Sequence, residues 1–220
     1  MATRTSRGDR ASATRELILA TAERLFAEHG VFAVSNRQVA EAAGQGNNAA
    51  VGYHVGTKID LVRAIAQKHA DAVERRRAQM VAAAGGSTDV RDWVACLVRP
   101  ITEHLAALGS PTWYARFGAQ VMTDPGLREI MIEEELGSPS LRQIVDGLRR
   151  CLPDLPDDVR RERADMSRQL MVHMLAERER ALADGTPTPR SSWPEAATGL
   201  IDAVVGLWLA PVTQTEEDAG

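Results

Sequence analysis

A cluster of polar side chains between residues 47 and 58 could hydrogen-bond to a polyanion. It holds two amides, a phenol, an imidazole and an ammonium group, on Asn47, Asn48, Tyr53, His54 and Lys58. Asparagine amides can pair with the edges of bases or bond to phosphate, and the other three groups can donate to phosphate oxygens. The chemistry that these side chains share is the binding of bases and phosphates through hydrogen bonds and charge.

The sequence before and within this cluster predicts two short helices joined by a tight turn. Ser35 and Gln38 have the spacing of a capping box, so a helix is expected to begin at Ser35. Gly44 is expected to end this helix, and a second helix is expected over about residues 47–53. Packed against an amphipathic helix over about residues 14–29, this pair has the pattern of a helix-turn-helix, whose second helix enters the major groove of DNA.

The start of the next helix adds to the same surface. Thr57 and Asp60 have the spacing of a second capping box, so this helix is expected to begin at Thr57. Free N–H groups at a helix start favour a phosphate, and Lys58 brings a positive charge to the same place.

The rest of the chain has apolar residues at three- and four-residue spacing and almost no strand signals, which predicts an all-α protein. Helices are expected from residue 57 and over about residues 88–108, 112–123, 125–151 with an interruption near 137–139, 156–185 and 192–209. With the three N-terminal helices, this makes about nine. Pro100 is expected to kink the helix over 88–108, because it has no N–H to donate.

Composition and charge narrow the possible functions. The 220 residues carry a net charge of −4, but the N-terminal arm is basic. Its charged residues up to residue 15 are one acidic residue, Asp9, and four basic ones, Arg4, Arg7, Arg10 and Arg15. This arm either touches phosphate or is simply solvated. No apolar run reaches the roughly 18 residues of a membrane span, and the polar N-terminus lacks the apolar stretch of a secretory signal. The chain is therefore expected to be cytoplasmic.

Metal, redox and catalytic motifs are not found in the sequence. Cys96 and Cys151 lie far apart, and we interpret them as reduced thiols, with a disulfide as the alternative. The five histidines do not have metal-ligand spacing, and nucleophile, P-loop and dinucleotide motifs are absent. We therefore predict a non-enzymatic protein without metal or cofactor, and treat an all-α enzyme as the weakest alternative.

Three segments, residues 25–30 (LFAEHG), 39–44 (VAEAAG) and 53–61 (YHVGTKIDL), together resemble the N-terminal domain of TetR-family transcriptional regulators. The resemblance implies a three-helix DNA-binding domain over residues 14–60 and an all-helical ligand-binding and dimerisation domain over 61–210. A flexible basic arm over 1–13 and a flexible acidic tail over 211–220 would flank them. It also implies DNA contacts by residues on both short helices and at the start of the next: Arg37, Asn47, Asn48, Tyr53, His54, Thr57 and Lys58.

Two sets of residues in the second half are candidates for further roles. The resemblance implies that the last two helices form a four-helix bundle with a twin subunit, and the alternative for their apolar faces is internal core. The candidate dimer contacts are Met166, Leu170, Met174, Leu200, Ile201, Val204, Val205 and Trp208. The candidate lining of a ligand pocket, each with a core position as the alternative, is Trp93, Cys96, His104, Trp113, Phe117, Gln120, Met122, Met171 and His173.

These features together predict a homodimeric transcriptional regulator, more specifically a repressor that an unidentified small-molecule effector releases from a palindromic operator in double-stranded DNA. No contact with a membrane is expected. The runner-up is a dimeric all-helical binding or adaptor protein that does not read DNA. Gly52 and Val55 keep it open, because the family usually has larger side chains at these positions.

Overall fold

The structure is a computed structural model that describes residues 7–47 and 49–213, with the backbone only for residue 7 and residues 133–136. These parts of the chain contain helices and no strand, which confirms the all-α prediction. The helices are α1 (Arg7–His29), α2 (Asn36–Ala42), α3 (Ala50–His54), α4 (Lys58–Ala84), α5 (Val90–Leu108), α6 (Tyr114–Met122), α7 (Pro125–Leu136), α8 (Pro139–Cys151), α9 (Asp157–Ala183) and α10 (Trp193–Leu209).

Two predicted boundaries are corrected. Helix α1 begins at Arg7 instead of residue 14, so residues 7–13 of the predicted arm are helical. Helix α3 starts at Ala50, three residues later than expected. The predicted interruption near residue 137 is confirmed: α7 ends at Leu136, and the Ser138 hydroxyl caps α8 by accepting the N–H of Leu141.

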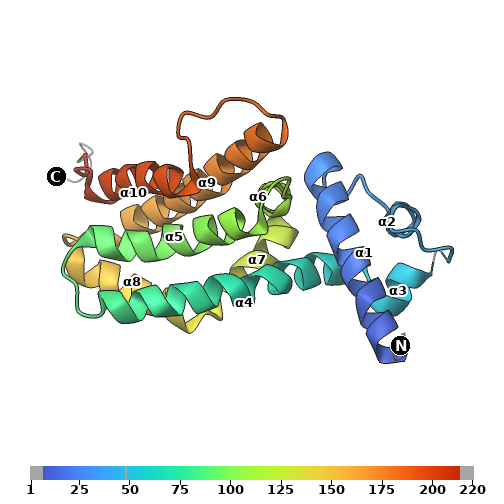
Figure 1. The fold of residues 1–220 in the computed structure, drawn as a ribbon. Helices are drawn as coiled ribbons and strands as arrows, with labels where there is room; N and C mark the ends of the chain where they lie inside the picture. The colour runs from blue at the N-terminus through green and yellow to red at the C-terminus, as the bar shows by residue number, and fades with distance from the viewer. Residues whose placement is uncertain (1–6, 48, 214–220) are drawn as a thin grey trace, which may run out of the picture.

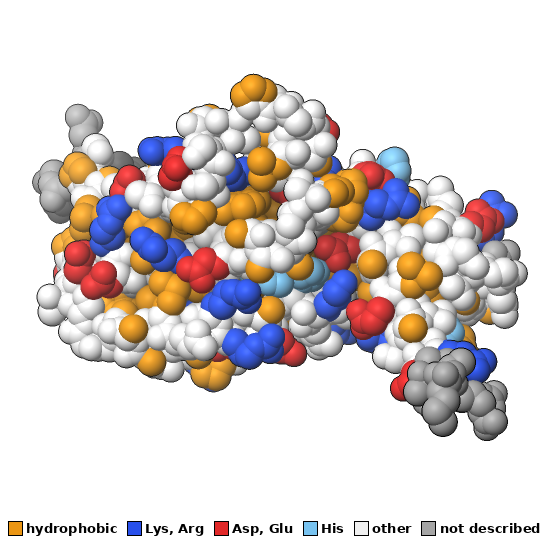
Figure 2. Space-filling view, viewed as in Figure 1, with side chains coloured by type: hydrophobic (Ala, Val, Ile, Leu, Met, Phe, Trp, Pro, Cys, Tyr) orange, Lys and Arg blue, Asp and Glu red, His pale blue; other side chains and the backbone are white. Residues whose placement is uncertain are grey.

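The helices form two bodies that the long helix α4 joins (Figure 1). Helices α1–α3 stand at one end with the start of α4, and the remainder of α4 runs along one edge of the body that α5–α10 form. We call the first body the N-terminal domain and the second the C-terminal domain. On the face shown in Figure 2, acidic and basic side chains are interspersed over both domains, so no single-sign field dominates that face.

The hydrophobic core of the N-terminal domain extends into the C-terminal domain. Ile18, Phe26, Val39 and Val51 are fully buried with Leu61 and Ile65 from α4, so the first turns of α4 contribute to this core. Phe117 of α6 lies in the same cluster, and its ring stacks on Phe26 with centroids 6.4 Å apart. A movement of α6 therefore changes the packing of α1.

The second core lies between α4, α5, α8, α9 and α10, and it contains one unusually close helix contact. Trp93 of α5 lies flat against the backbone of Gly147 in α8, where an added Cβ would be 2.2 Å from the indole ring. The Trp93 Nε1–H donates to the Ser87 carbonyl at 3.0 Å, which holds the ring in place. Glycine at this position lets the two helices approach.

Among the described residues, no helix is long and apolar enough to cross a membrane.

Replacing Gly147 with alanine is expected to lower the free energy of unfolding by about 1–3 kcal/mol, because the ring or the helix must shift. The control is Gly118→Ala in α6, where an added Cβ meets no atom within 4 Å. That change is expected to raise stability by up to about 1 kcal/mol, since alanine has the higher helix propensity. Urea denaturation of both variants measures the difference, and equal effects would contradict the close contact.

Candidate DNA-binding surface and the contacts behind it

Both predicted capping boxes are present and fix the helices around the candidate surface. The Ser35 hydroxyl accepts the N–H of Gln38 at 3.2 Å, while the Gln38 amide oxygen accepts the N–H of Ser35 at 2.8 Å. Thr57 and Asp60 make the same reciprocal pair at the start of α4. The Thr57 N–H and hydroxyl lower the pKa of the Asp60 carboxyl. Thr57 is thus a cap, and its N–H and hydroxyl are already bonded within the chain.

Helix α3 buries one side and exposes the other. Ala50 and Val51 pack into the core, whereas the Tyr53 side chain is 85% exposed. The Tyr53 and His54 rings meet edge to face, 5.0 Å apart, so the phenol and the half-buried imidazole lie together on the outside. This is an arrangement of hydrogen-bond donors that a phosphate could approach.

Asn47, one of the predicted DNA contacts, lies before helix α3 and not on it. Asn47 is exposed in the turn, and its side-chain oxygen accepts the N–H of Ala49 at 2.9 Å. Asn48 lies outside the described residues. Arg37 projects from α2 and makes an exposed ion pair with Glu41 at 3.7 Å, which a phosphate could replace at little cost.

Lys58 has a local partner that the sequence did not reveal. Its ammonium group donates to the Phe32 carbonyl at 3.3 Å and lies 5.8 Å from the centre of the Phe32 ring. Burial lowers the pKa of Lys58. The Phe32 side chain is 67% exposed in the loop between α1 and α2, so an apolar ring borders the cationic group.

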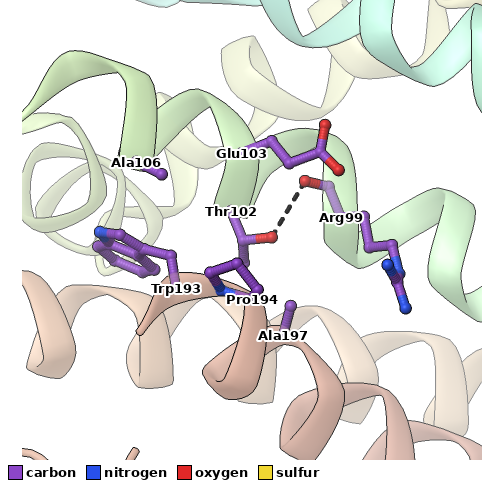
Figure 3. A pocket seen from close by; sticks show the side chains of 7 residues that line it. All are labelled: Arg99, Thr102, Glu103, Ala106, Trp193, Pro194 and Ala197. Atoms are coloured by element: carbon purple, nitrogen blue, oxygen red, sulfur yellow. Dashed lines mark hydrogen bonds between the residues drawn. The ribbon is translucent and has the colours of Figure 1, made fainter. Parts of the chain in front are cut away.

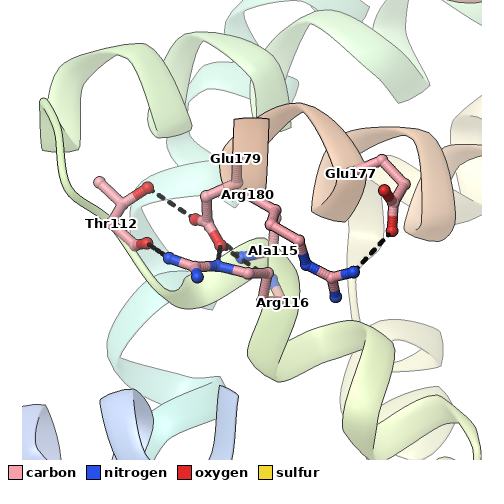
Figure 4. Close-up of polar contacts among 6 residues, drawn as sticks. All are labelled: Thr112, Ala115, Arg116, Glu177, Glu179 and Arg180. Carbon is pink, nitrogen blue, oxygen red and sulfur yellow. Dashed lines mark hydrogen bonds and ion pairs between the residues drawn. The ribbon is translucent and has the colours of Figure 1, made fainter. Parts of the chain in front are cut away.

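In the C-terminal domain, a buried carboxylate joins α9 to the start of α6 (Figure 4). Glu179 accepts hydrogen bonds from the Thr112 hydroxyl at 2.6 Å and from the backbone N–H groups of Ala115 and Arg116 at 3.2 and 2.9 Å. It also pairs with the Arg116 guanidinium at 3.3 Å. Arg116 is thus a salt-bridge residue, and its guanidinium lies 4.3 Å from the centre of the Trp113 ring.

The structure does not bring the predicted pocket residues together in one cavity. Trp93, Cys96 and Phe117 are buried in core packing, Met122 is buried, and His173 is exposed on α9. His104 is buried and hydrogen-bonded, and Met171 is half-buried at the edge of the second core. Trp113 and Gln120 do lie on one hollow, of about 510 Å³, where the ends of α1 and α9 meet α6.

A second, smaller cleft lies between α5 and the start of α10. Figure 3 shows Arg99, Thr102 and Glu103 on one side of it and Trp193 and Pro194 on the other. Its volume is about 60 Å³, well below the roughly 300 Å³ of a typical ligand pocket. None of the predicted pocket residues lines it.

The candidate dimer contacts divide into an inner and an outer set. Leu200, Ile201, Val204 and Trp208 of α10 are buried in the second core of the single chain, which favours the internal-core alternative for these four residues. The outer set is exposed or half-buried on α9 and α10 and comprises Met166, Leu170, Met174 and Val205. The sequence pattern could not separate the two, since both follow the helical repeat.

A sequence match in the C-terminal domain shows which family the chain belongs to. Residues 95–206 match the family described as "Tetracyclin repressor-like, C-terminal domain". The chain belongs to the TetR family. It is thus an all-helical DNA-binding transcriptional regulator, which agrees with the N-terminal resemblance found in the sequence.

A solved TetR-family structure is also similar to the chain. It is the crystal structure of the TetR family transcriptional regulator PfmR from Thermus thermophilus. The two sequences are 16% identical, the match covers 96% of this chain and 100% of that one, and the TM-score is 0.49. No curated protein sequence matches the chain.

Proposed function

We propose that this TetR-family chain is a homodimeric repressor that a small-molecule effector releases from a palindromic operator. The observation that supports it best is the exposed surface of α3 and the start of α4, where Tyr53, His54 and Lys58 offer donors beside the exposed Asn47. These groups suit phosphates and base edges, and capping boxes fix the starts of α2 and α4, the helices that precede and follow α3 in the chain.

The proposed dimer uses the outer faces of α9 and α10. The side chains of Met166 and Met174 on α9 are 45% and 54% exposed, and Leu209 on α10 is 52% exposed. Large apolar side chains grouped on neighbouring helices favour a partner surface. Two copies with their α3 helices about 34–36 Å apart would fit successive major grooves, which is why we expect a palindromic operator.

The proposed effector site is the hollow between α1, α6 and α9. It joins Glu28 at the end of α1 to Trp113, Arg116 and Gln120 around α6, so a ligand there would touch both domains. A volume of about 510 Å³ suits a small molecule. An effector can weaken DNA binding only if it binds the DNA-free arrangement more tightly than the DNA-bound one.

The first test is selection from random duplex DNA, followed by fluorescence anisotropy on the enriched sequences at several salt concentrations. An enriched palindrome whose affinity falls steeply with salt supports the repressor. A protein that enriches no sequence and binds no DNA at low salt would be a helical binding protein instead, and the proposal would be wrong.

Lys58→Ala is expected to weaken binding of all sequences about equally and to reduce the slope of log affinity against log salt by about 1. The reason is that one phosphate contact is lost while base contacts remain. The control is Arg161→Ala, which removes an exposed positive charge from α9. Anisotropy titrations of both variants should leave the control slope unchanged. An unaltered slope for Lys58→Ala would exclude its phosphate contact.

A further inference from the structure

A buried chain of hydrogen bonds connects the N-terminal domain to the C-terminal domain. His69 of α4 lies at its centre, with its Nε2 3.1 Å from a Glu23 carboxylate oxygen of α1 and its Nδ1 2.8 Å from His104 Nε2 of α5. All three side chains are buried. The Tyr114 ring of α6 stacks on His69 with centroids 3.9 Å apart, so four helices meet at this cluster.

The two histidines can keep this chain intact only while at least one of them is neutral. With Glu23 ionised and both rings neutral, His69 donates to the carboxylate and accepts the N–H of His104. A proton added to His69 reverses the direction of the hydrogen bond between the two rings but does not break it. His69 Nδ1–H then donates, and His104 Nε2 accepts. A further proton on His104 sets two N–H groups against each other, and the hydrogen bond between the rings is lost.

We propose that Glu23, His69 and His104 form a proton-sensitive latch, which holds α1 against α4 and α5 and opens when His104 takes up a proton. This proposal rests on the proposed repressor function, because the latch would fix the DNA-binding surface relative to the C-terminal domain. An opened latch would weaken operator binding, since two loosely held domains must be ordered again on DNA.

The surroundings of the latch determine how easily His104 takes up a proton. Burial, then His69 and then Arg76 of α4 lower the pKa of His104 to about 4, while Glu23 acts in the opposite sense. Lys68 of α4 lies 3.8 Å from the Glu23 carboxylate and adds further positive charge. Tyr114, the group that faces the cluster from α6, lies edge to face with His104 at 5.9 Å.

The size of the effect follows from the two states of His104. In the open latch its pKa returns to the ordinary value of about 6.5, so the open state takes up the proton first. Between pH 7.5 and 5.5 the equilibrium constant for opening should rise about tenfold. At pH 7.5 His104 is mostly neutral even in the open state, so protonation hardly favours opening and the latch remains closed.

Hydrogen exchange of the whole protein, corrected for the intrinsic pH dependence of exchange, tests the latch without DNA. Between pH 7.5 and 5.5, amides in the middle of α1 and α4 should lose about tenfold more protection than amides in α8. His104→Gln keeps a neutral donor for His69 and should remove this difference. His173→Gln, the same change at the exposed histidine of α9, should retain it. Equal pH dependence of α1, α4 and α8 in the unmodified protein would overturn the proposal.

Operator affinity at the same two pH values tests the consequence for DNA. Protons taken up elsewhere can also change DNA binding, so the informative quantity is the difference between the protein and its His104→Gln variant. We expect affinity to fall more in the protein than in the variant. Binding with identical pH dependence in both would overturn the latch while leaving the repressor proposal intact, whereas absence of DNA binding at both pH values would contradict the repressor alone.

Discussion

Glu179→Ala is expected to lower the free energy of unfolding by about 3–5 kcal/mol, because it leaves the Arg116 guanidinium buried without its counter-ion. The carboxylate also accepts the Thr112 hydroxyl and two backbone N–H groups at the first turn of α6. Those donors would lose their partner in a largely buried place, and each adds to the cost.

Glu177→Ala is the matched control for this prediction. Glu177 is on the same helix two residues earlier and also pairs with an arginine, Arg180, at 3.2 Å, but both side chains are more than half exposed. Its removal is expected to cost no more than about 1 kcal/mol. Urea denaturation at one fixed protein concentration, which the proposed dimer makes necessary, compares the two. Similar losses for both variants would show that Glu179 is not the buried partner of Arg116.

The sequence predicted the helices well where their start signals are local. Ser35 with Gln38 and Thr57 with Asp60 are neighbours in the chain, so the capping boxes and the order of α2, α3 and α4 followed from spacing alone. The start of α1 was misplaced, because residues 7–13 have no strong apolar repeat to extend the helix.

The sequence could not predict contacts between distant segments. Glu179 and Arg116 are 63 residues apart, and Glu23 and His69 are 46 apart, so no spacing rule connects them. Likewise, both faces of α10 are apolar, and only the fold shows that Leu200 points inward and Leu209 outward.

The candidate DNA-binding residues, by contrast, are close in sequence. Tyr53 and Lys58 lie on the neighbouring helices α3 and α4, which a single turn joins, so the sequence could place them near each other.

His104 is expected to make the protein less stable as the pH falls from about 6.5 to about 4. Burial first, then the positive charges of His69 and Arg76, lower its pKa in the folded protein to about 4, while the unfolded chain has the ordinary value of about 6.5. The unfolded state therefore binds the proton first. The contribution of the neutral ring is fully present above pH 6.5, and about 3 kcal/mol is lost by pH 4.

His104→Gln should remove this pH dependence, because glutamine does not titrate. The interval between pH 6.5 and 5 is the informative one. The Asp60 and Glu195 carboxyls also have lowered pKa values, through hydrogen bonds from Thr57 and Ser191, but they lose their contributions only at lower pH. Urea denaturation at half-unit pH steps should therefore show the protein losing stability through this interval while the variant stays nearly level. Parallel curves would show that His104 is as easily protonated in the folded protein as in the unfolded chain.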